Sequence, residues 1–473
     1  MTAFKSAHWV PLADVLLQTP RDNMLRVATS ATGDKTWQQL QLDVACLAAE
    51  LETVPVQRWA MCFQDSYWLL VALLGVAAAG RQGVLPGNTQ PAALQALTGQ
   101  FDGLLCDDDI QLGTELPVVR LAEGYFCECM ARHHTAAVQR QFAVPLDLAT
   151  TTLLLFTSGS SGVPKCVSKS FQQLENEINQ LEACWGAELD SANCVVSTVS
   201  HQHIYGLLFR VIWPLCAGRC FERLDRIYPE QVMAHADPET ILISSPALLR
   251  RLPPAINDRT YRRVFSSGGP LPYASAIEVE KRFGQLAIEV FGSTETGGIG
   301  YRQQVNNATP WRLFPGIQAQ LDPAGCLRIL SPFIDLQHWY QTQDQCDLVD
   351  GGRFILKGRA DRIVKIEEKR ISLVEVEQRL CQLDWVEEAA VLPLQTGQRI
   401  QLAAVVVLSA AGQVLYAEQG KGKFSLLLRQ LLRQWIEPVG IPRRYRIVTT
   451  IPVNPQGKRL INQLSDLFTE RSH

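Results

Sequence analysis

The sequence has no excess of charge of either sign. Its 44 Lys and Arg residues against 47 Asp and Glu give a formal net charge of −3, and charged residues make up only 19% of the 473 positions, below the usual quarter. A chain with this balance has no broad positive field to hold nucleic acid or anionic lipid. We therefore predict that nucleic acid is not a partner.

The sequence also lacks long apolar runs. The longest, residues 68–80, is far shorter than the ~20 residues that a membrane-spanning helix needs. The helix predicted at residues 67–79 is apolar on most faces, so we expect it to be buried and not amphipathic. The first 18 residues include His8 and Asp14 and show no apolar segment of the signal-peptide kind. We expect a soluble, cytoplasmic protein without a membrane span.

The 13 cysteines lack the regular, even spacing of a disulfide framework. They also lack the paired Cys-x-x-Cys spacing of a zinc ribbon. Cys127 and Cys129, and Cys216 and Cys220, are close in sequence, and we interpret them as thiols of the core and not as metal ligands. A reducing compartment fits this pattern best.

Changes in pattern divide the chain. From about residue 36 to residue 300, helix-length segments alternate with short apolar runs, as in a parallel sheet covered by helices. Residues 318–357 switch to short strands and turns. The pattern changes again near residue 358, and the last part includes a predicted amphipathic helix at residues 424–436. We predict an α/β protein: a large N-terminal domain of layered α/β subdomains plus a β-rich appendage (1–358), and a small, mobile α+β C-terminal domain (359–473).

A glycine-rich loop follows a predicted strand at residues 151–156. Residues 157–165 read Thr-Ser-Gly-Ser-Ser-Gly-Val-Pro-Lys, and Ser170-x-x-Gln173 is a capping box that opens a helix. Glycines let the backbone approach a polyphosphate, while hydroxyls and a lysine supply donors and charge. The spacing is not that of a Walker loop, and a plain Ser/Gly turn is the alternative for this segment alone.

Residues 291–295, Phe-Gly-Ser-Thr-Glu, follow another predicted strand. Loops at strand exits are where α/β proteins usually place their sites. The carboxylate of Glu295 offers oxygen ligands of the kind that Mg²⁺ takes beside substrate phosphates. A solvated surface acid is the alternative.

Three weaker motifs lie further along. Asp344 ends Tyr-Gln-Thr-Gln-Asp and suits ribose hydroxyls, while Arg359, in Gly-Arg-Ala-Asp, suits phosphate or carboxylate. Lys458 closes Asn-Pro-Gln-Gly-Lys, a turn-forming sequence that displays it on a loop. An isolated loop lysine is normally inert, so none of these motifs is specific alone.

Taken in order, these motifs resemble those of the adenylate-forming superfamily, which includes acyl-CoA synthetases, peptide-synthetase adenylation domains and beetle luciferases. The resemblance spans about residues 36–464. Residues 157–165 are similar to the family's phosphate loop, and residues 291–295 to its aromatic-Gly-x-Thr-Glu motif. Residues 358–365 are similar to its Gly-Arg-x-Asp hinge segment, and residues 455–458 to its terminal lysine motif.

The resemblance implies a role for each matching residue. The ATP phosphates would be cradled by Thr157, Ser158, Gly159, Ser160, Ser161, Gly162 and Lys165. Phe291 would stack on adenine, Thr294 would contact phosphate during catalysis, and Glu295 would bind Mg²⁺. Asp344 would hold the ribose hydroxyls, assisted by Arg359.

The resemblance also implies how the reaction proceeds. Lys458 would contact the carboxylate and the α-phosphate during in-line attack, where it stabilises charge that develops in the transition state. Asp361 would be the pivot about which the terminal domain swings between adenylation and thioester formation. His203, with Gly268 and Gly269, would line the acyl pocket; a packed core histidine is the alternative for His203.

The chain departs from the family pattern at two points. Gln343 replaces the glycine of Thr-Gly-Asp, which makes Asp347 a rival to Asp344 as the ribose ligand. Glu368 stands where acyl-CoA synthetases usually carry a glycine beside the pantetheine tunnel. The segment is similar to that of stand-alone ligases that charge carrier proteins, so CoA and an acyl carrier protein both stay open as acceptors.

The absence of one aspartate indicates the class of carboxylic acid that the protein uses as substrate. Peptide-synthetase domains pair an aspartate with the amino group of their substrate, but residues 199–206 contain none, and an unpaired buried ammonium is costly. We predict an ATP- and Mg²⁺-dependent ligase that adenylates an aryl or fatty carboxylic acid, not an α-amino acid, and transfers it to the thiol of CoA or phosphopantetheine. The alternatives are a non-catalytic adenylate-binding homologue and a luciferase-like oxygenase.

Overall fold

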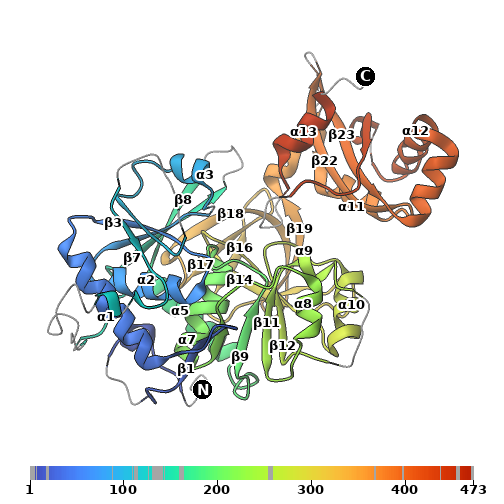
Figure 1. Ribbon diagram of the computed structural model, residues 1–473. Helices are drawn as coiled ribbons and strands as arrows, with labels where there is room; N and C mark the ends of the chain where they lie inside the picture. Colours follow the sequence, from blue (N-terminus) through green and yellow to red (C-terminus); the bar gives the residue numbers. More distant parts are fainter. Residues whose placement is uncertain are drawn as a thin grey trace. The chain divides into compact units, whose positions relative to one another are not determined.

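The computed structural model describes residues 6, 8–17, 21–87, 89–108, 110, 116–125, 127–129, 142, 144–158, 164–253, 259–366, 369–396, 399–436, 438–453 and 459–469. The chain divides into two compact units: Met1–Gln318 with Leu330–His338, and Ala319–Ile329 with Trp339–His473. Both units combine sheets with helices (Figure 1), which confirms the predicted α/β class. The functional division predicted between residues 358 and 359 stays a prediction.

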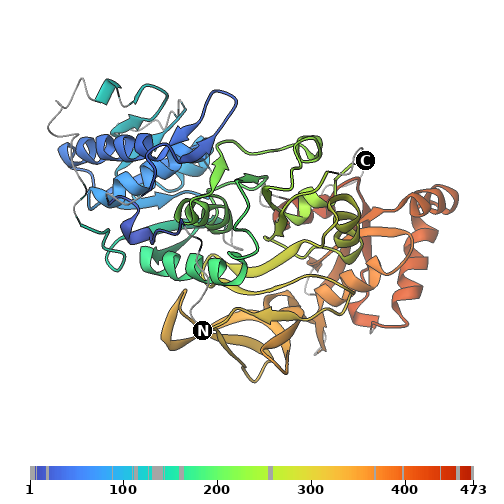
Figure 2. The ribbon, with the colours of Figure 1, turned by 90° about the horizontal axis from the view of Figure 1, so that it is seen from below.

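A six-stranded sheet lies in the first part of unit 1, in the order β6-β5-β3-β4-β7-β8. Its strands are β3 (Arg58–Cys62), β4 (Gln82–Leu85), β5 (Gly103–Cys106), β6 (Val118–Arg120), β7 (Thr152–Ser158) and β8 (Pro164–Ser170). Neighbours run parallel except β7 and β8, which form an antiparallel hairpin. Helix α2 (Ser66–Ala78) packs on β3 and β4 and against α1 (Trp37–Thr53), as Figure 2 shows. Because α2 is buried on all sides, the prediction of a fully buried helix here is confirmed.

The second sheet of unit 1 runs in the order β15-β14-β13-β12-β11-β9-β10-β1-β2. Its strands are β1 (Arg26–Thr29), β2 (Lys35–Thr36), β9 (Cys194–Ser197), β10 (Cys220–Glu222), β11 (Thr240–Ser244), β12 (Arg263–Ser266), β13 (Ile288–Ser293), β14 (Gly297–Arg302) and β15 (Trp311–Leu313). From β13 to β1 all neighbours are parallel. The carboxyl ends of these strands therefore meet at one edge, where α/β proteins place their sites.

Three helices cover the middle of this sheet and enclose one apolar core with it: α8 (Pro229–Ala234), α9 (Pro246–Leu249) and α10 (Tyr273–Phe283). Helix α5 (Phe171–Trp185) begins at the predicted capping box, in which Ser170 accepts from the Gln173 amide and the Gln173 side chain accepts from the Ser170 amide. This cap fixes the direction of the chain where it leaves the β7–β8 hairpin.

Unit 2 begins with β-rich structure, as predicted for residues 318–357. Its elements are β16 (Gln318–Leu321), β17 (Cys326–Ser331), β18 (Asp335–Val349), β19 (Arg353–Arg359), the hairpin β20 (Ile363–Ile366) and β21 (Lys369–Ser372), then β22 (Val386–Thr396), β23 (Arg399–Leu408) and β24 (Arg444–Ile447). One face of the β22-β23-β24 sheet packs on α11 (Leu373–Cys381) and α12 (Ala410–Leu432), and the other packs on α13 (Ile461–Thr469). Unit 2 thus has its own two-sided core.

Helix α12 differs from the sequence prediction, which placed an amphipathic helix at residues 424–436. The helix begins at Ala410, after a cap in which Ser409 accepts from the Gly412 amide, and it is broken at Gly420, where φ is 73° and ψ is 165°. The apolar periodicity covers only the second half, because most side chains of the first half are exposed. Periodicity alone therefore missed residues 410–423, which make about four turns at ~3.6 residues per turn.

All 13 cysteines are free thiols. Cys129, Cys216 and Cys220 are buried as predicted, but Cys127 is exposed, so its assignment to the core was wrong. Residues 127–129 are helical, and positions two apart on a helix lie on opposite sides of it. No helix in the described ranges combines the length and the apolarity needed to cross a bilayer.

Candidate active site

The β7–β8 hairpin carries the glycine-rich loop. Thr157 is paired with Lys165, and Ser158 with Pro164, in antiparallel register. The pairing places Thr157 and Lys165 directly across from each other at the base of the loop. The side chain of Ser158 and the loop residues Gly159, Ser160, Ser161 and Gly162 lie outside the described part of the chain.

A tight turn between β13 and β14 carries the second motif. A side chain at Gly292 would place its Cβ 2.2 Å from the carbonyl oxygen of Gly297, so only glycine allows the two strands to approach here. The buried Thr296 hydroxyl accepts a hydrogen bond from the Ser293 amide at 3.0 Å. This fixed turn leaves Thr294 and Glu295 partly exposed at the strand exit.

Phe291, predicted to stack on adenine, ends the regular part of β13 and is partly exposed. Its ring lies against Trp311, with centroids 5.5 Å apart and planes tilted by 51°. The guanidinium of Arg302 lies over the same indole, 4.3 Å from its centroid. The aromatic side chain is thus held by packing from β14 and β15, which limits its rotation.

The two motifs meet in unit 1. The ammonium of Lys165 lies 2.6 Å from the carboxylate of Glu295. Burial is the largest single influence and opposes ionisation of this carboxyl. The hydrogen bonds from Lys165, the backbone and Ser293, together with the charge of Lys165, outweigh it and lower the pKa of Glu295. An ionised oxygen ligand therefore stands beside the base of the glycine-rich loop.

This arrangement fits Mg²⁺ and a polyphosphate. Mg²⁺ usually takes one or two protein carboxylates and completes its octahedron with water and substrate phosphates, and Glu295 provides such a carboxylate. Over the described ranges, no cluster of three or more His, Cys, Asp and Glu side chains forms a closed metal cage. The donors present suit a metal that arrives with its nucleotide.

Two buried charged side chains next to the site, those of Lys169 and Glu177, were not predicted from the sequence. The ammonium of Lys169 donates to the carbonyl oxygens of Glu295 and Phe333, both at 2.8 Å. Glu177, fully buried on α5, accepts from the Gly298 amide at 2.7 Å. Burial lowers the pKa of Lys169 and raises that of Glu177, and each charge opposes the shift of the other. The signal was an acid on the apolar face of the predicted helix.

The predicted acyl-pocket residues all follow parallel strands. Gly268 and Gly269 leave β12, and Gly268 has φ of 92°, a conformation that favours glycine. The Ser267 hydroxyl donates to the carbonyl of Val290 at 2.8 Å, which ties this exit to β13. His203 follows β9 and is partly buried at the start of α6 (Ile204–Gly206). All lie beyond carboxyl ends of the second sheet.

His201, two residues earlier, is a buried structural histidine. Its Nδ1 lies 2.7 Å from the Ser66 hydroxyl, and its Nε2 lies 2.8 Å from the carbonyl oxygen of Phe63. These contacts join the exit of β9 to the exit of β3 in the other sheet. Burial lowers the pKa of His201 to about 4, assisted by the charge of Arg210.

We expect His201 to make the stability of unit 1 depend on pH. Its folded pKa lies below the unfolded value of ~6.5, so the neutral ring stabilises the fold above pH ~6.5 and this contribution is lost as pH falls toward 4. The loss should approach about 3 kcal/mol, an upper bound set by ~1.4 kcal/mol per pKa unit. Urea unfolding at pH 7 and pH 4.5 measures it. In His201→Gln this pH-dependent part of the free energy of unfolding should vanish. A variant with the same pH dependence as the parent chain would show that His201 is not its source.

The predicted ribose site lies in unit 2. Asp344 on β18 is the cross-strand neighbour of Arg359 on β19, with 3.7 Å between carboxylate and guanidinium. The Asp344 amide donates to the Thr342 hydroxyl at 3.1 Å. The rival Asp347 pairs with Lys357 at 2.6 Å and both are more than half exposed, whereas the Asp344 side chain is only 14% exposed. Asp344 is the better protected of the two acids.

The structure describes the backbone of Asp361 and the residues on either side of the segment that contains Lys458. The backbone of Asp361 lies in a 3₁₀ turn (Ala360–Arg362) between β19 and β20, and Lys458 and Glu368 lie outside the described residues. The loop that holds Lys458 is closed at its base by an antiparallel bridge between Val453 and Arg459. Arg459 is the described residue that directly follows Lys458 in the chain.

Arg459 is held by one buried acid. Its guanidinium lies 2.9 Å from the carboxylate of Glu377 on α11, which also pairs with Arg362 and accepts from the Val391 amide at 2.7 Å. A second, weaker partner is Glu388, at 3.6 Å. The side chain of Glu377 is 11% exposed and that of Glu388 is 31% exposed, so Glu377 is the main anchor.

We expect Glu377→Gln to slow adenylation by about tenfold without removing any reacting group, because a small displacement of a catalytic group is enough for such a loss. The amide retains an acceptor for Val391 but not the charge that holds Arg459. Pyrophosphate release measures the rate. The matched control is Glu388→Gln, which should change it less than about twofold; equal effects would show that Glu377 does not position the loop.

Comparisons with known proteins agree on one group of enzymes. The AMP-binding enzyme family matches residues 105–324. A 4-coumarate–CoA ligase of Rhodobacter capsulatus is 27% identical over 302 residues, 64% of this chain and 73% of that enzyme. A D-alanine–D-alanyl carrier protein ligase of Staphylococcus aureus is 23% identical over 347 residues, 65% and 69% of the two chains. The crystal structure of ATP-bound MatB from Rhodopseudomonas palustris shares the fold, with a TM-score of 0.78, 19% identity and coverage of 97% and 99%.

Proposed function

Because this chain belongs to the adenylate-forming superfamily of AMP-binding enzymes, we propose that it is an ATP- and Mg²⁺-dependent ligase that joins a carboxylic acid to a pantetheine thiol. The acid attacks the α-phosphate of ATP, pyrophosphate leaves, and the thiol then displaces AMP from the acyl-adenylate. The observation that carries the proposal is the 2.6 Å contact between Lys165 and Glu295. It joins the glycine-rich hairpin and the strand-exit carboxylate in one place.

Each of the motif residues in unit 1 has a defined part in this proposal. Thr157, Lys165 and the loop between them bind the β and γ phosphates, Thr294 contacts phosphate, and Phe291 presents its ring to adenine. Glu295 holds Mg²⁺, which supplies charge neutralisation to the phosphates when bound. Lys165 already lies at hydrogen-bond distance from Glu295, so it can exchange this carboxylate for a phosphate oxygen with little movement.

The proposed roles in unit 2 rest on the motifs and on local order. Asp344 binds the ribose hydroxyls with Arg359 beside it, and Lys458 stabilises the charge that develops as the carboxylate attacks. Asp361 is proposed as the hinge, since it lies in the short turn that follows β19. CoA and a carrier protein remain the two proposed acceptors, and relatives named for each exist.

The proposed substrate is an aryl or fatty acid without an α-amino group. The segment that contains His203 offers no carboxylate for an ammonium, and an unpaired buried charge is costly. A comparison of two acids that differ only in this group tests the point. We expect 3-phenylpropanoate or another simple acid to support pyrophosphate release and phenylalanine to fail.

The test of the whole proposal is pyrophosphate release by the purified chain with ATP, Mg²⁺ and a panel of aryl, cinnamic-type and medium-to-long fatty acids. Each acid is assayed without acceptor, with CoA, and with phosphopantetheinylated carrier protein. Stimulation by one thiol identifies the acceptor. ATP binding without turnover across the panel would favour an adenylate-binding protein, and oxygen uptake that depends on ATP and acid would favour an oxygenase.

A further inference from the structure

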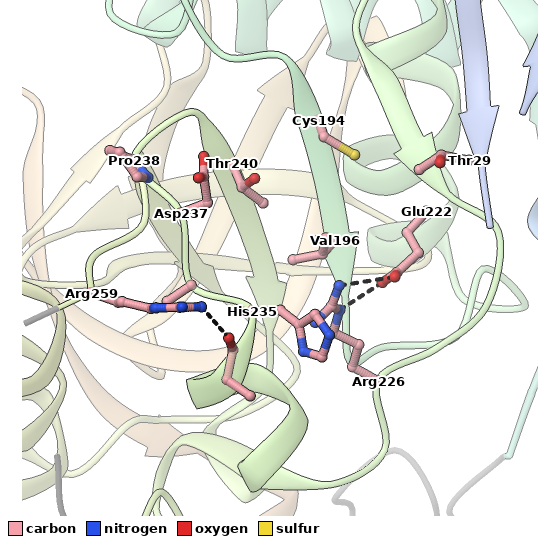
Figure 3. Close-up of a pocket in the computed structure, with 12 residues that line it drawn as sticks. Thr29, Cys194, Val196, Glu222, Arg226, His235, Asp237, Pro238, Thr240 and Arg259 are labelled. Carbon is pink, nitrogen blue, oxygen red and sulfur yellow. Dashed lines mark hydrogen bonds and ion pairs between the residues drawn. The ribbon is translucent and has the colours of Figure 1, made fainter. Parts of the chain in front are cut away.

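An open cavity of about 570 Å³ lies in unit 1 (Figure 3). Its floor is one face of the second sheet, where Cys194, Thr240 and Glu222 contribute side chains from β9, β11 and β10. Helix α8 and the turn after it, which includes His235, form a wall. Cys194 and Thr240 are the first residues of their strands, whereas Glu222 and Thr29 are the last residues of β10 and β1. The cavity therefore runs along this face of the sheet, and the described residues that line it do not include Lys165 or Glu295 of the candidate active site.

Two thiols lie side by side in the part of the sheet that forms this floor. Cys194 and Cys220 are paired directly in parallel register, so their side chains leave the same face of neighbouring strands. Cys194 lines the cavity and is partly exposed, whereas Cys220 is only 3% exposed. Adjacent strands lie ~4.8 Å apart, within the ~4.4–6.8 Å that a disulfide requires between Cα atoms.

The surroundings favour a thiolate at Cys194. The hydrogen bond with Cys220, supported by the charge of Arg26, lowers the pKa of Cys194 against the effects of burial and of Glu222. Glu222 is itself paired with Arg226 through two contacts of 2.6 and 2.9 Å (Figure 3). A thiolate that is accessible and near a guanidinium is the usual form of a reactive cysteine.

We propose that Cys194 and Cys220 form a peroxide-reactive dithiol, in which Cys194 reacts first and Cys220 resolves the product. The Cys194 thiolate attacks one oxygen of hydrogen peroxide, the O–O bond breaks, and a sulfenic acid forms while the departing hydroxide takes a proton and becomes water. Cys220 then attacks the sulfenic sulfur. The S–S bond forms, the S–O bond breaks, and the hydroxyl leaves as water with the proton of the second thiol.

The chain contains a matched comparison pair. Cys62 and Cys106 are also paired directly on neighbouring parallel strands, β3 and β5. Both are buried, and burial raises the pKa of each. The two pairs share the same strand geometry, but only Cys194 is accessible to solvent. We therefore expect Cys62 and Cys106 to resist oxidation by peroxide. Reaction of Cys194 and Cys220 alone would show that the cavity and the local charges matter, and not mere proximity of sulfur atoms.

The experiment treats the reduced, full-length chain with hydrogen peroxide, blocks remaining thiols, and follows each cysteine by peptide mass spectrometry. We expect a Cys194–Cys220 linked peptide, with Cys194 consumed at least about tenfold faster than the exposed single thiol Cys381. The Cys62 and Cys106 peptides should stay reduced. Equal oxidation of both pairs, or a Cys194 that reacts no faster than Cys381, overturns the proposal.

Two variants separate the roles of the thiols. In Cys220→Ser, Cys194 should stop at the sulfenic acid and be trapped by a dimedone probe. In Cys194→Ser, Cys220 should remain reduced because it is buried. A Cys220 that is oxidised without Cys194 would overturn the assigned order. None of these readouts depends on ligase activity, so the result is separate from the proposed function.

Discussion

Lys458→Ala should lower the rate of acyl-adenylate formation by ~10²–10³-fold, the loss expected when one preorganised charge-stabilising group is removed. The lysine meets developing charge only in the transition state, so the effect should fall on the rate of pyrophosphate release more than on ATP binding. Transfer of the acyl group from acyl-adenylate that is supplied ready-made should be much less affected. The two half-reactions, assayed separately, provide the measurement.

A surface lysine of the same unit serves as the control for this variant. Lys421 is exposed on α12, and Lys421→Ala should leave both half-reactions unchanged. The folded state of Lys458→Ala should match that of the parent chain by circular dichroism, because the β-bridge between Val453 and Arg459 does not use the lysine side chain. Unaltered pyrophosphate release in Lys458→Ala would remove Lys458 from the proposed mechanism.

Lys169→Met should destabilise unit 1 by about 1–3 kcal/mol, because it leaves buried carbonyl oxygens without their hydrogen-bond donor. The ammonium donates to the carbonyl oxygens of Glu295 and Phe333, and its charge opposes the effect of burial on the pKa of Glu177. Urea unfolding at pH 7, followed by tryptophan fluorescence, measures the change. A double variant with Glu177→Gln should recover part of the loss, since it removes the buried charge of Glu177.

The matched control for this prediction is Lys165→Met, four residues earlier on the same strand. Lys165 pairs with an acid, but its side chain is 56% exposed, so its removal should cost less than about 1 kcal/mol. This variant should instead slow adenylation, because Lys165 is proposed to bind phosphate. If both variants lost the same stability, the buried Lys169 would not be the support of the site.

The sequence was most informative where a pattern reports directly on local structure. The capping box at Ser170 and the buried helix α2 were both predicted and are both present. The motifs around Thr157 and Glu295 were also found, but their 2.6 Å contact was not predicted, because it joins residues far apart in the chain through strand pairing. Lys169 was missed for the same reason: no local pattern indicates which carbonyl groups a buried lysine will meet.

Other failures have local physical causes. Exposure of Cys127 was not predicted, because a cysteine in a polar segment has no periodicity that assigns it to either side. The first half of α12 was missed because few of its side chains contact the core. The cross-strand neighbours Cys194 and Cys220 lie 26 positions apart, and only the order of the strands brings them together.

The break at Gly420 has a consequence for the dynamics of unit 2. It divides α12 into two segments, residues 410–419 and 421–432, and neither exceeds the ~12–15 residues at which an isolated helix is still only marginally stable in water. The second segment is anchored in the core by Phe424, Leu428 and Leu432, whereas the first is mostly exposed. Amide hydrogens of residues 414–419 should therefore exchange with solvent through local opening, well before those of residues 424–432.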